Sequence, residues 1–296
     1  MTFCTKCGNE LVEGAKFCPK CGTAVDTAAI RSTRETLKKP KRKPMSIMTI
    51  ALIAIVAVVI IVLLSTMFLS GWQPFGEVVG SGDLVTNEEF FSDFTAVDAG
   101  SGFSVEISES NSFSVLVTAD DNVMDYVEIT KSGDTLMIRV EWGYSFRSVT
   151  LKAEITMPEL HSLELSGGAK GKLEELNASN QFSVRLSGGS RLTGEFETSE
   201  DAEFYLSGGS HLSGFVGEAN DLIIDASSGS HTDLSDFEVH DADVELSGGS
   251  RATINLDGRL DADLSGGSHL NYIGDPTLGD IETSGDSKIS KLSIPV

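Results

Sequence analysis

Cysteine, positive charge and catalytic motifs are all scarce in this chain. Four cysteines among 296 residues exclude a small domain held together by disulfide bonds. The 22 Lys and Arg residues face 44 Asp and Glu residues, a formal net charge of −22, so no nucleic-acid partner is expected. The sequence also has no nucleophile elbow, no phosphate-binding loop and no His-Glu-x-x-His motif, which argues against an enzyme of these classes.

The positive charge is concentrated at one end of the chain. Residues 1–45 hold ten Lys and Arg against four Asp and Glu, whereas the remainder holds twelve against forty. By length alone, 296 residues favour about two domains. The opposite charge of the two regions suggests that these domains have different surroundings.

A long run without charge separates the two regions. Residues 47–69 contain no charged side chain and are rich in Ile, Val, Leu and Ala, within a charge-free stretch that extends from 44 to 76. As a helix, this run would measure about 34 Å, enough to cross a hydrocarbon core of about 30 Å. The run predicts a single transmembrane helix over residues 46–70, in contact with membrane lipid.

Charges on either side of this run predict its orientation. A basic cluster at residues 38–43 precedes the run, and Trp72, Phe75 and an acidic region follow it. The positive-inside rule then places the N-terminus in the cytoplasm and the region after the run outside the cell membrane. A cleaved signal peptide is the alternative, but it needs a shorter apolar run and a shorter N-terminal segment. Segments 26–45 and 71–93 are expected to be linkers.

All four cysteines lie in the first 25 residues, in a repeated motif. Phe-Cys-Thr-Lys-Cys-Gly begins at Phe3, and Phe-Cys-Pro-Lys-Cys-Gly begins at Phe17. Four thiolates with this spacing form a closed tetrahedral site, which is typical of structural zinc. The predicted zinc ligands are Cys4, Cys7, Cys18 and Cys21. Because so small a domain has little core, the zinc ion would supply most of its folding free energy.

Two other roles for the cysteines fit less well. Thiol–disulfide exchange usually employs one Cys-x-x-Cys motif beside a βαβ unit, for which 25 residues leave no room. An extracellular disulfide pair would contradict the predicted orientation. Residues 2–23 resemble the short zinc-ribbon domain found at the N-terminus of many prokaryotic membrane proteins. A cytosolic protein is the partner that we consider for this ribbon.

Seven copies of a short phrase organise the region after the apolar run. Each copy reads Leu-Ser-Gly-Gly-Ser or a close variant, and consecutive copies lie 18 to 21 residues apart. The first serines of the copies are Ser166, Ser187, Ser207, Ser227, Ser247, Ser265 and Ser284. Apolar and polar residues alternate before each of these serines, which indicates a half-buried strand. Leucine-rich repeats and βαβ units fit poorly, because no amphipathic helical pattern lies between the copies.

Strands that recur about every 20 residues predict an all-β fold, a right-handed single-stranded parallel β-helix (a solenoid) over residues 94–296. Each coil would stack on the previous one at the interstrand spacing of about 4.8 Å. The paired glycines suit sharp corners that need a positive φ, and the small residue closing each phrase suits an inward corner position. A β-propeller or a sandwich would need longer repeats or less regular spacing. The complete prediction adds the single transmembrane helix and the small N-terminal zinc ribbon.

The first part of the solenoid region is less regular than the rest. Residues 94–160 are expected to form opening coils and a cap, followed by regular coils over 161–296; a separate small β-domain is the alternative. From Phe94 onward the chain resembles the family called putative auto-transporter adhesin, head GIN domain. The resemblance is carried by Pro158, by Leu-Glu-Leu-Ser-Gly-Gly-Ala at 163–169 and by the later Ser-Gly-Gly copies. It implies the solenoid fold and, through the family name, a role in adhesion.

Stacked coils place equivalent residues in columns, and one column is basic. The residues four after each first serine are Lys170, Arg191, His211, His231, Arg251, His269 and Lys288. We name this set the basic column and treat it as a candidate binding site for an anionic cell-envelope polymer or glycan. Two alternatives remain open, a solvated corner whose cations offset neighbouring acids and a histidine-rich metal site.

Acidic residues also form columns. The first acidic column contains Asp225, Glu245, Asp263 and Glu282, and the second acidic column contains Asp243, Asp261 and Asp280. Like charges on adjacent strands destabilise a sheet, so divalent cations, chiefly Ca²⁺, are candidates to offset them. Solvent, salt and shifted pKa values are the alternative.

Three functions follow from these features. The first is a non-catalytic adhesion or envelope-scaffold module on a membrane anchor, with the zinc ribbon in the cytosol. The second is a transmembrane regulator that couples the state of the envelope to a cytosolic partner. The third is a polysaccharide-active enzyme, which we do not favour because the acids repeat with the fold and the long loops that build a substrate cleft are missing.

Overall fold

The computed structural model describes most of the chain after residue 75. The described residues are 76–178, 181–198 and 200–293, together with 2, 3, 6, 7, 10, 11, 17, 18, 20 and 21 near the N-terminus. The chain divides into two units, Met1–Trp72 and Gln73–Val296. In the first unit, β1 (Thr2–Phe3) pairs antiparallel with β2 (Glu10–Leu11). Every other described strand belongs to the second unit.

The transmembrane helix expected over residues 46–70 is not supported. The described part of the chain contains no helix with the length and apolar character that a bilayer crossing requires. Its helix α3 (Asp121–Met124) has four residues, and residues 46–70 lie outside the described residues. A charge-free composition measures apolarity alone and does not by itself establish a helix. The fold class is therefore corrected to an all-β solenoid with a zinc ribbon.

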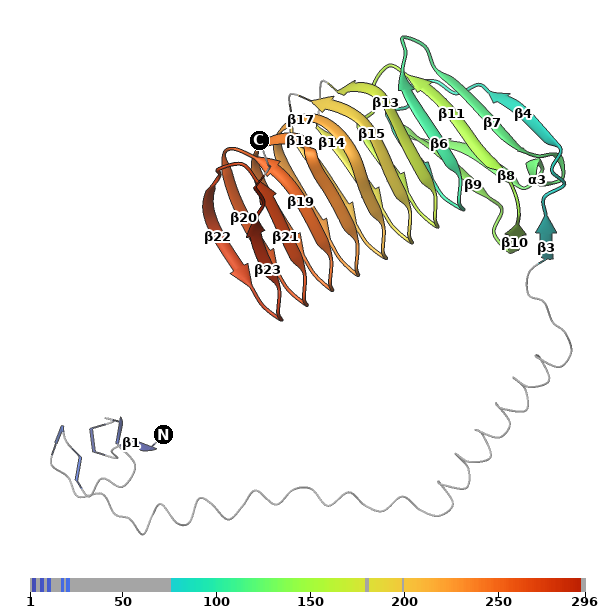
Figure 1. Ribbon diagram of the computed structural model, residues 1–296. Helices are drawn as coiled ribbons and strands as arrows, with labels where there is room; N and C mark the ends of the chain where they lie inside the picture. The colour runs from blue at the N-terminus through green and yellow to red at the C-terminus, as the bar shows by residue number, and fades with distance from the viewer. Residues whose placement is uncertain are drawn as a thin grey trace, which may run out of the picture. The chain divides into compact units, whose positions relative to one another are not determined.

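The second unit is a β-solenoid with two walls (Figure 1). From the capped end, the first wall contains β8 (Val127–Ser132), β9 (Thr135–Val140), β5 (Ala96–Ala99), β12 (Ser162–Leu165), β14 (Phe182–Leu186), β16 (Ala202–Leu206), the second halves of β17 (His211–Ala226) and β18 (His231–Leu246), β20 (Arg259–Leu264) and β22 (Thr277–Thr283). The second wall contains β4 (Leu84–Glu89), β7 (Ser114–Asp120), β11 (Leu151–Met157), β6 (Ser104–Glu109), β13 (Lys170–Ala178), β15 (Arg191–Thr198), the first halves of β17 and β18, β19 (Arg251–Leu256), β21 (His269–Ile273) and β23 (Lys288–Lys291).

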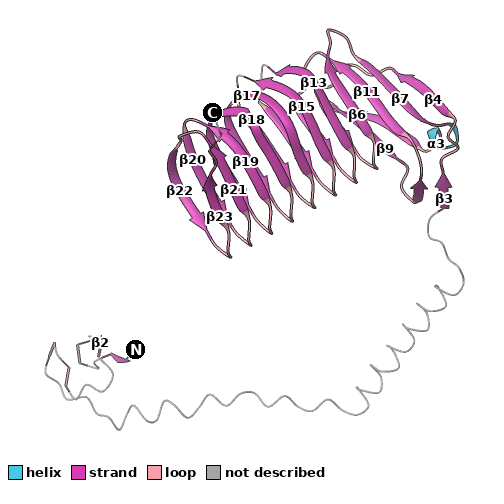
Figure 2. Ribbon diagram, viewed as in Figure 1, coloured by secondary structure: helices cyan, strands magenta, loops and turns pink. Residues whose placement is uncertain are grey.

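Strand direction differs between the coils and the cap. All pairs from β5 and β6 to β22 and β23 are parallel, as a solenoid requires, whereas β4, β7 and β8 pair antiparallel with their neighbours. Two further strands, β3 (Gly76–Val79) and β10 (Tyr144–Arg147), form a separate parallel pair. The strands dominate the described part of this unit, as the magenta ribbons of Figure 2 show. The β-solenoid predicted from the repeat is confirmed, and its right-handed sense of winding stays a prediction.

The alternation of the sequence places one side of every strand inside. The residue before each first serine is buried in six coils, and these residues are Leu165, Leu186, Leu206, Ala226, Leu246 and Leu264. Gly171 breaks the second inward set, where other coils carry Leu192 or Leu212. A Cβ on Gly171 would lie 2.7 Å from Cδ1 of both Leu165 and Leu192, so these two leucines already fill its space.

A cluster of phenylalanines fills the middle of the solenoid. Its members are Phe182, Phe196, Phe204, Phe215 and Phe237, all buried. Ring centroids of neighbours lie between 4.0 and 6.2 Å apart. The whole buried hydrophobic cluster lies between Phe94 and Leu270, so the unit Gln73–Val296 has a core of its own and can fold alone.

The Ser-Gly-Gly phrase forms a type I′ turn at the corner between the two walls. In the first copy, Gly167 and Gly168 have φ of 58° and 79°, and the N–H of Ala169 donates to the carbonyl of Ser166 at 3.1 Å. Positive φ at both central residues defines this turn and explains the glycine pair. The first glycine is also crowded by the adjacent coil, since a Cβ on Gly188 would lie 3.1 Å from the nitrogen of Gly167.

The serine that closes most copies is buried because the corner itself satisfies its hydroxyl. Ser190, Ser210, Ser230, Ser250 and Ser268 are at most 1% exposed. The Oγ atom of Ser210, for example, donates to the carbonyl of Ser207 at 2.6 Å. A buried polar group is tolerated when it is hydrogen-bonded, and serine is small enough for the corner.

The structure contains a further corner that the sequence analysis missed. Residues 100–103 form the same turn, with φ of 56° at Ser101 and 79° at Gly102. The N–H of Ser166 donates to the carbonyl of Ala99 at 3.0 Å, so this corner stacks against the first Ser-Gly-Gly copy. Its sequence, Gly-Ser-Gly-Phe, lacks both the leading serine and the small closing residue of the repeat.

Candidate functional site

The basic column forms a continuous row on the second wall, just after the corner. Strand register pairs Lys170 with Arg191, Arg191 with His211, His211 with His231, His231 with Arg251, Arg251 with His269, and His269 with Lys288. The residue that follows each of them in the chain points inward, so these side chains point outward. Each of these residues stands four positions after the first serine of its copy. Parallel pairing preserves this number of positions from coil to coil, so the seven residues align.

None of the seven side chains forms an ion pair with another described residue. The Lys and Arg members are exposed, and the three histidines are partly exposed. The rings of His211 and His231 lie 6.0 Å apart, and Nδ1 of His211 has no hydrogen-bond partner among the described residues. The solvated-corner interpretation expected acids beside these cations, and the described residues supply none in ion-pair contact.

A histidine outside the column shows the contrast. Nδ1 of His240 lies 2.9 Å from Oδ1 of Asp257. The hydrogen bond to Asp257 and the charge of Asp241 raise the pKa of His240 above its ordinary value of 6.5. A histidine of this domain can therefore have an acidic partner, which the histidines of the basic column lack.

Lys152 extends the row toward the cap but is neutralised. Register places Lys152 beside Ser104, which pairs in turn with Lys170. The ammonium of Lys152 lies 3.1 Å from carboxylate oxygens of both Glu154 and Glu106, and these acids raise its pKa. The repeat gave no signal for Lys152, because β11 arrives from the cap insertion and not from a regular coil.

The acidic columns lie on the first wall, on the other side of the same corner. Asp225 pairs with Glu245, Glu245 with Asp263, and Asp263 with Glu282, while Asp243 pairs with Asp261. Toward the cap, the same outward row changes character, because Arg185 stacks 4.6 Å above the ring centroid of Tyr205. The row of negative charge is thus interrupted at Tyr205 and Arg185, and acids return nearer the cap at Glu164 and Asp98.

The second acidic column is partly neutralised by the protein itself. Arg259 binds Asp261 through two hydrogen bonds, each of 2.6 Å, and the N–H of Asp280 donates to the same carboxylate at 2.6 Å. Arg259 first, and then the N–H of Asp280, lower the pKa of Asp261. Asp261, one of the three carboxylates of the second acidic column, is therefore already bound by Arg259 and by the backbone of Asp280.

Calcium is not supported at these columns. Ca²⁺ takes six to eight oxygen ligands at 2.3–2.6 Å, so its carboxylates must converge on one point. Among the residues that the structure describes, no three carboxylates bring their oxygens within 4.8 Å of one another. The physical reason is that side chains of one column leave the wall side by side and run parallel. The expectation of Ca²⁺ is therefore withdrawn.

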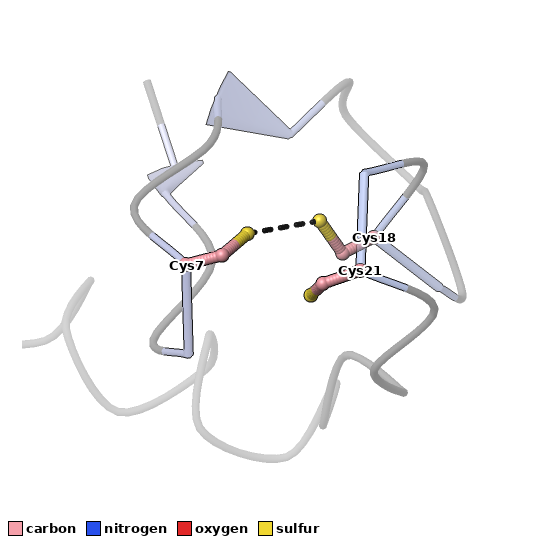
Figure 3. Close-up of side chains that lie close together, drawn as sticks. All are labelled: Cys7, Cys18 and Cys21. Carbon is pink, nitrogen blue, oxygen red and sulfur yellow. Dashed lines mark hydrogen bonds between the residues drawn. The ribbon is translucent and has the colours of Figure 1, made fainter.

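The cysteine cluster is the group of potential metal ligands that does converge. The sulfur atoms of Cys7, Cys18 and Cys21 lie within 4.8 Å of one another (Figure 3). The Sγ atoms of Cys7 and Cys18 are 3.6 Å apart, much longer than a disulfide bond of about 2.05 Å. Two thiolates of a tetrahedral zinc site, with Zn–S bonds of about 2.3 Å, lie about 3.8 Å apart.

These three cysteines therefore fit zinc. Cys18 is buried, whereas Cys7 and Cys21 are exposed. Cys4, the fourth predicted ligand, lies outside the described residues, and so do residues 26–45 and 71–75 of the expected linkers. A closed sulfur site of this kind has a structural role and no open position for catalysis.

A groove beside the basic column is a feature that the sequence analysis did not find. It has a volume of about 930 Å³ and is lined by Ser108, Glu109, Ser110, Asn111, Lys172, Leu173, Glu174, Thr193, Gly194, Glu195, Gly214 and Val216. A Cβ on Gly194 would lie 2.4 Å from the carbonyl oxygen of Leu173, so the backbone requires glycine there. Gly194 and Gly214, which lie inside strands, could have indicated this groove in the sequence, because glycine inside a strand often marks a bulge.

Two family models match the chain. The model described as "Putative auto-transporter adhesin, head GIN domain" matches residues 93–276, and a zinc-ribbon domain model matches residues 3–25. Both resemblances stated from the sequence are thereby confirmed. No curated protein matches the chain.

Solved structures share the solenoid. One titled a putative adhesin from Bacteroides fragilis has a TM-score of 0.67 and 16% identity, covering 73% of this chain and 100% of that one. Another putative adhesin, from Parabacteroides merdae, has a TM-score of 0.55 and 19% identity, covering 74% and 100%. A putative lipid binding protein from Parabacteroides distasonis has a TM-score of 0.51 and 17% identity, covering 73% and 100%. At this identity the likeness shows the fold alone.

The family model covers well over half of the chain, and the corners, walls and cysteine cluster agree with the two matches. This chain therefore belongs to the family named putative auto-transporter adhesin, head GIN domain, and carries a zinc-ribbon domain at its N-terminus.

Proposed function

We propose that this protein is a non-catalytic adhesion module of the cell surface, and that its solenoid binds an anionic envelope polymer, an acidic glycan or a phosphate polymer, through the basic column. The observation that supports this function is a row of seven cationic or titratable side chains without an ion pair to any described residue. The family name and the adhesin titles of solved structures support the adhesive role.

Electrostatics explains why the row would favour an extended anion. At an interstrand spacing of about 4.8 Å, seven side chains form a row about 29 Å long. Neighbouring cations lie well within the screening length of about 8 Å at physiological ionic strength, so they repel one another. Like charges on adjacent strands cost stability, and a polymer that places an anion near each cation would remove that cost.

The groove and the corner support recognition of a polymer over recognition of a small molecule. Lys172 and Thr193 line the groove and stand two residues after Lys170 and Arg191 of the basic column. The groove therefore borders the row and offers the hydroxyls of Ser108, Ser110 and Thr193 to the uncharged parts of a bound chain. Its carboxylates would repel anionic groups, which leaves those groups to the basic column. Such an open surface suits many weak contacts along a strand of polymer.

Catalysis is not part of this function. The acids repeat with the coils, and the carboxylates of the acidic columns do not converge. The solved relatives carry the names of adhesins and of a lipid binding protein, none of which is an enzyme name. The zinc ribbon would contribute a folded N-terminal domain held by Cys7, Cys18 and Cys21, with Cys4 as the fourth ligand.

Binding of residues 73–296 to immobilised polyuronate and teichoic acid tests the proposal. We expect binding that weakens with added salt, because dissolved ions screen the exposed cations of the basic column. Replacement of Arg191, His211, His231, Arg251 and His269 by Ser should weaken binding by about tenfold or more. Replacement of Lys131, Arg147, Arg185, His161 and His240 by Ser, which removes five basic residues outside the column, is the matched control and should leave binding unchanged.

Two results would contradict the proposal. The first is a wild-type domain that binds neither polymer even at low salt. The second is an equal loss of binding in the control variant, which would mean that net charge alone governs binding.

A further inference from the structure

The end of the solenoid formed by β22 and β23 leaves inward positions uncovered. Leu278 is 50% exposed, although it continues the inward row of Leu260, which is fully buried. Ile281 and Ile289, next to the buried Ala262 and Leu270, are partly exposed. At the opposite end, the cap buries Val97 and Val105 completely. Apolar surface is therefore available at one end of the solenoid.

The strands at this end have a described partner on one side alone. Strand β22 pairs with β20, and β23 pairs with β21; the described residues supply no strand beyond them. An edge strand presents unpaired N–H and C=O groups and readily accepts another strand. Both walls therefore end in an edge that can be extended.

The two edges carry opposite charge. Strand β22 exposes Asp280 and Glu282, whereas β23 exposes Lys288 and Lys291. Lys291 already forms an ion pair with Asp275, but no ion pair links Lys288 to any described residue. An acidic edge and a basic edge on one surface are complementary to a second copy of the same surface.

Two-fold symmetry allows two ways of joining such ends. With the axis parallel to the strands, the first wall of one copy continues into the second wall of the other, so β22 meets β23. With the axis perpendicular to the walls, β22 meets β22, and carboxylates face carboxylates. Like charges on adjacent strands destabilise a sheet, which favours the first arrangement.

We propose that this end of the solenoid binds a second copy of the chain, with β22 of each copy pairing antiparallel with β23 of the other. The chain runs toward the corner in β22 and away from it in β23, so the antiparallel direction follows from the symmetry. The two corners then coincide. This brings Glu282, two residues before Ser284, beside Lys288 of the second copy, which directly follows the corner.

This inference does not depend on anion binding, and self-association measures it. Sedimentation equilibrium of residues 73–296 and of the full chain should show a dimer. Glu282→Lys and Lys288→Glu should each weaken the dimer by about tenfold or more, because each creates two repulsive contacts. An equimolar mixture of the two variants should recover the dimer, since the introduced lysine of one variant then faces the introduced glutamate of the other. Glu245→Lys, in the same acidic column but paired on both sides, should have no effect.

Thermal melting of each variant by circular dichroism distinguishes dissociation from unfolding, and Leu278→Ser provides a second variant that should weaken the dimer while the monomer stays folded. A wild-type chain that is monomeric at every concentration would overturn the proposal. A dimer that withstands both charge reversals, or a mixture that fails to recover, would overturn the β22–β23 pairing.

Discussion

The regular coils and the cap of this solenoid are stabilised by different interactions. Each coil repeats the same interactions, an inward apolar row and a type I′ corner in which the closing serine donates its hydroxyl to a nearby backbone carbonyl. The cap contains an interaction that the coils do not repeat. Asp120 is buried, and its carboxylate accepts hydrogen bonds from the N–H of Thr150 at 2.6 Å and of Gly82 at 2.7 Å. A coil is thus stabilised by packing and a repeated corner, whereas the cap combines its own hydrophobic packing with a buried polar anchor at Asp120.

Truncation of a core aromatic should have the largest effect on the coils. Phe204 contacts Phe215 and Phe237, with ring centroids 5.7 and 6.2 Å apart. Phe204→Ala should lower the free energy of unfolding by about 3–5 kcal/mol, because it leaves a cavity. Chemical denaturation of residues 73–296 measures this loss. Phe90→Ala, at a side chain that is 88% exposed, is the control, and an equal loss there would contradict the assigned core.

The corner glycines should divide into two classes. Gly248 and Gly249 both have positive φ, but a Cβ on Gly248 would lie 3.1 Å from the nitrogen of Ser228, while a Cβ on Gly249 meets open space. Gly249→Ala should cost about 1 kcal/mol for the left-handed conformation. Gly248→Ala should cost more, because backbone of the adjacent coil must move. Equal losses in chemical denaturation would show that the coils are not tightly stacked at the corner.

The cap should respond to acid through the buried carboxylate of Asp120. The N–H groups of Thr150 and Gly82 lower the pKa of Asp120 below its ordinary value near 3.8. Ionised Asp120 therefore stabilises the folded state above that pH, and this contribution is lost as the pH falls below it. Asp120→Asn should lower the melting temperature at pH 7 and reduce the acid sensitivity. A variant with an unchanged melting temperature would contradict the role of Asp120 as an anchor.

The smallest effect is expected in the basic column. Arg191 lies beside Lys170, a second permanent cation, so Arg191→Ser should relieve repulsion and stabilise the fold by a few tenths of a kcal/mol. The same change should weaken binding to anionic polymer. Melting temperature and polymer affinity, measured on the same variant, check whether stability rises while binding weakens. If Arg191→Ser destabilises the domain, this arginine contributes to the stability of the fold, and the basic column is not explained by ligand binding.

The regular coils could be predicted from the sequence because each coil repeats the same constraints. Distance from the corner serine placed Lys170, Arg191 and the other members in one row, since parallel register preserves that distance. The corner at residues 100–103 was missed because its turn uses other residues in the same conformation. The Asp120 anchor and the groove depend on long-range contacts that no periodicity encodes.

Two predictions, the transmembrane helix and the Ca²⁺ site, failed because residue composition does not determine secondary structure or the convergence of ligands. The lack of charge in residues 47–69 indicated apolarity, but no described helix can cross a membrane. The repetition of acids indicated negative rows, but ligation of Ca²⁺ needs convergence, and Asp261 is already bound by Arg259. The cysteine spacing was a better guide, since it fixes how closely three sulfur atoms can approach.

The central claim is that the basic column binds an anionic polymer, and the histidine side chains allow a direct test. His211, His231 and His269 lie in the column, whereas His161 and His240 lie outside it. Titration of residues 73–296 with teichoic acid can be followed through the imidazole resonances of all five histidines by NMR. We expect the three column resonances to shift together and saturate, while those of His161 and His240 stay in place. Saturating binding without a shift at the column, or equal shifts at all five histidines, would contradict the claim.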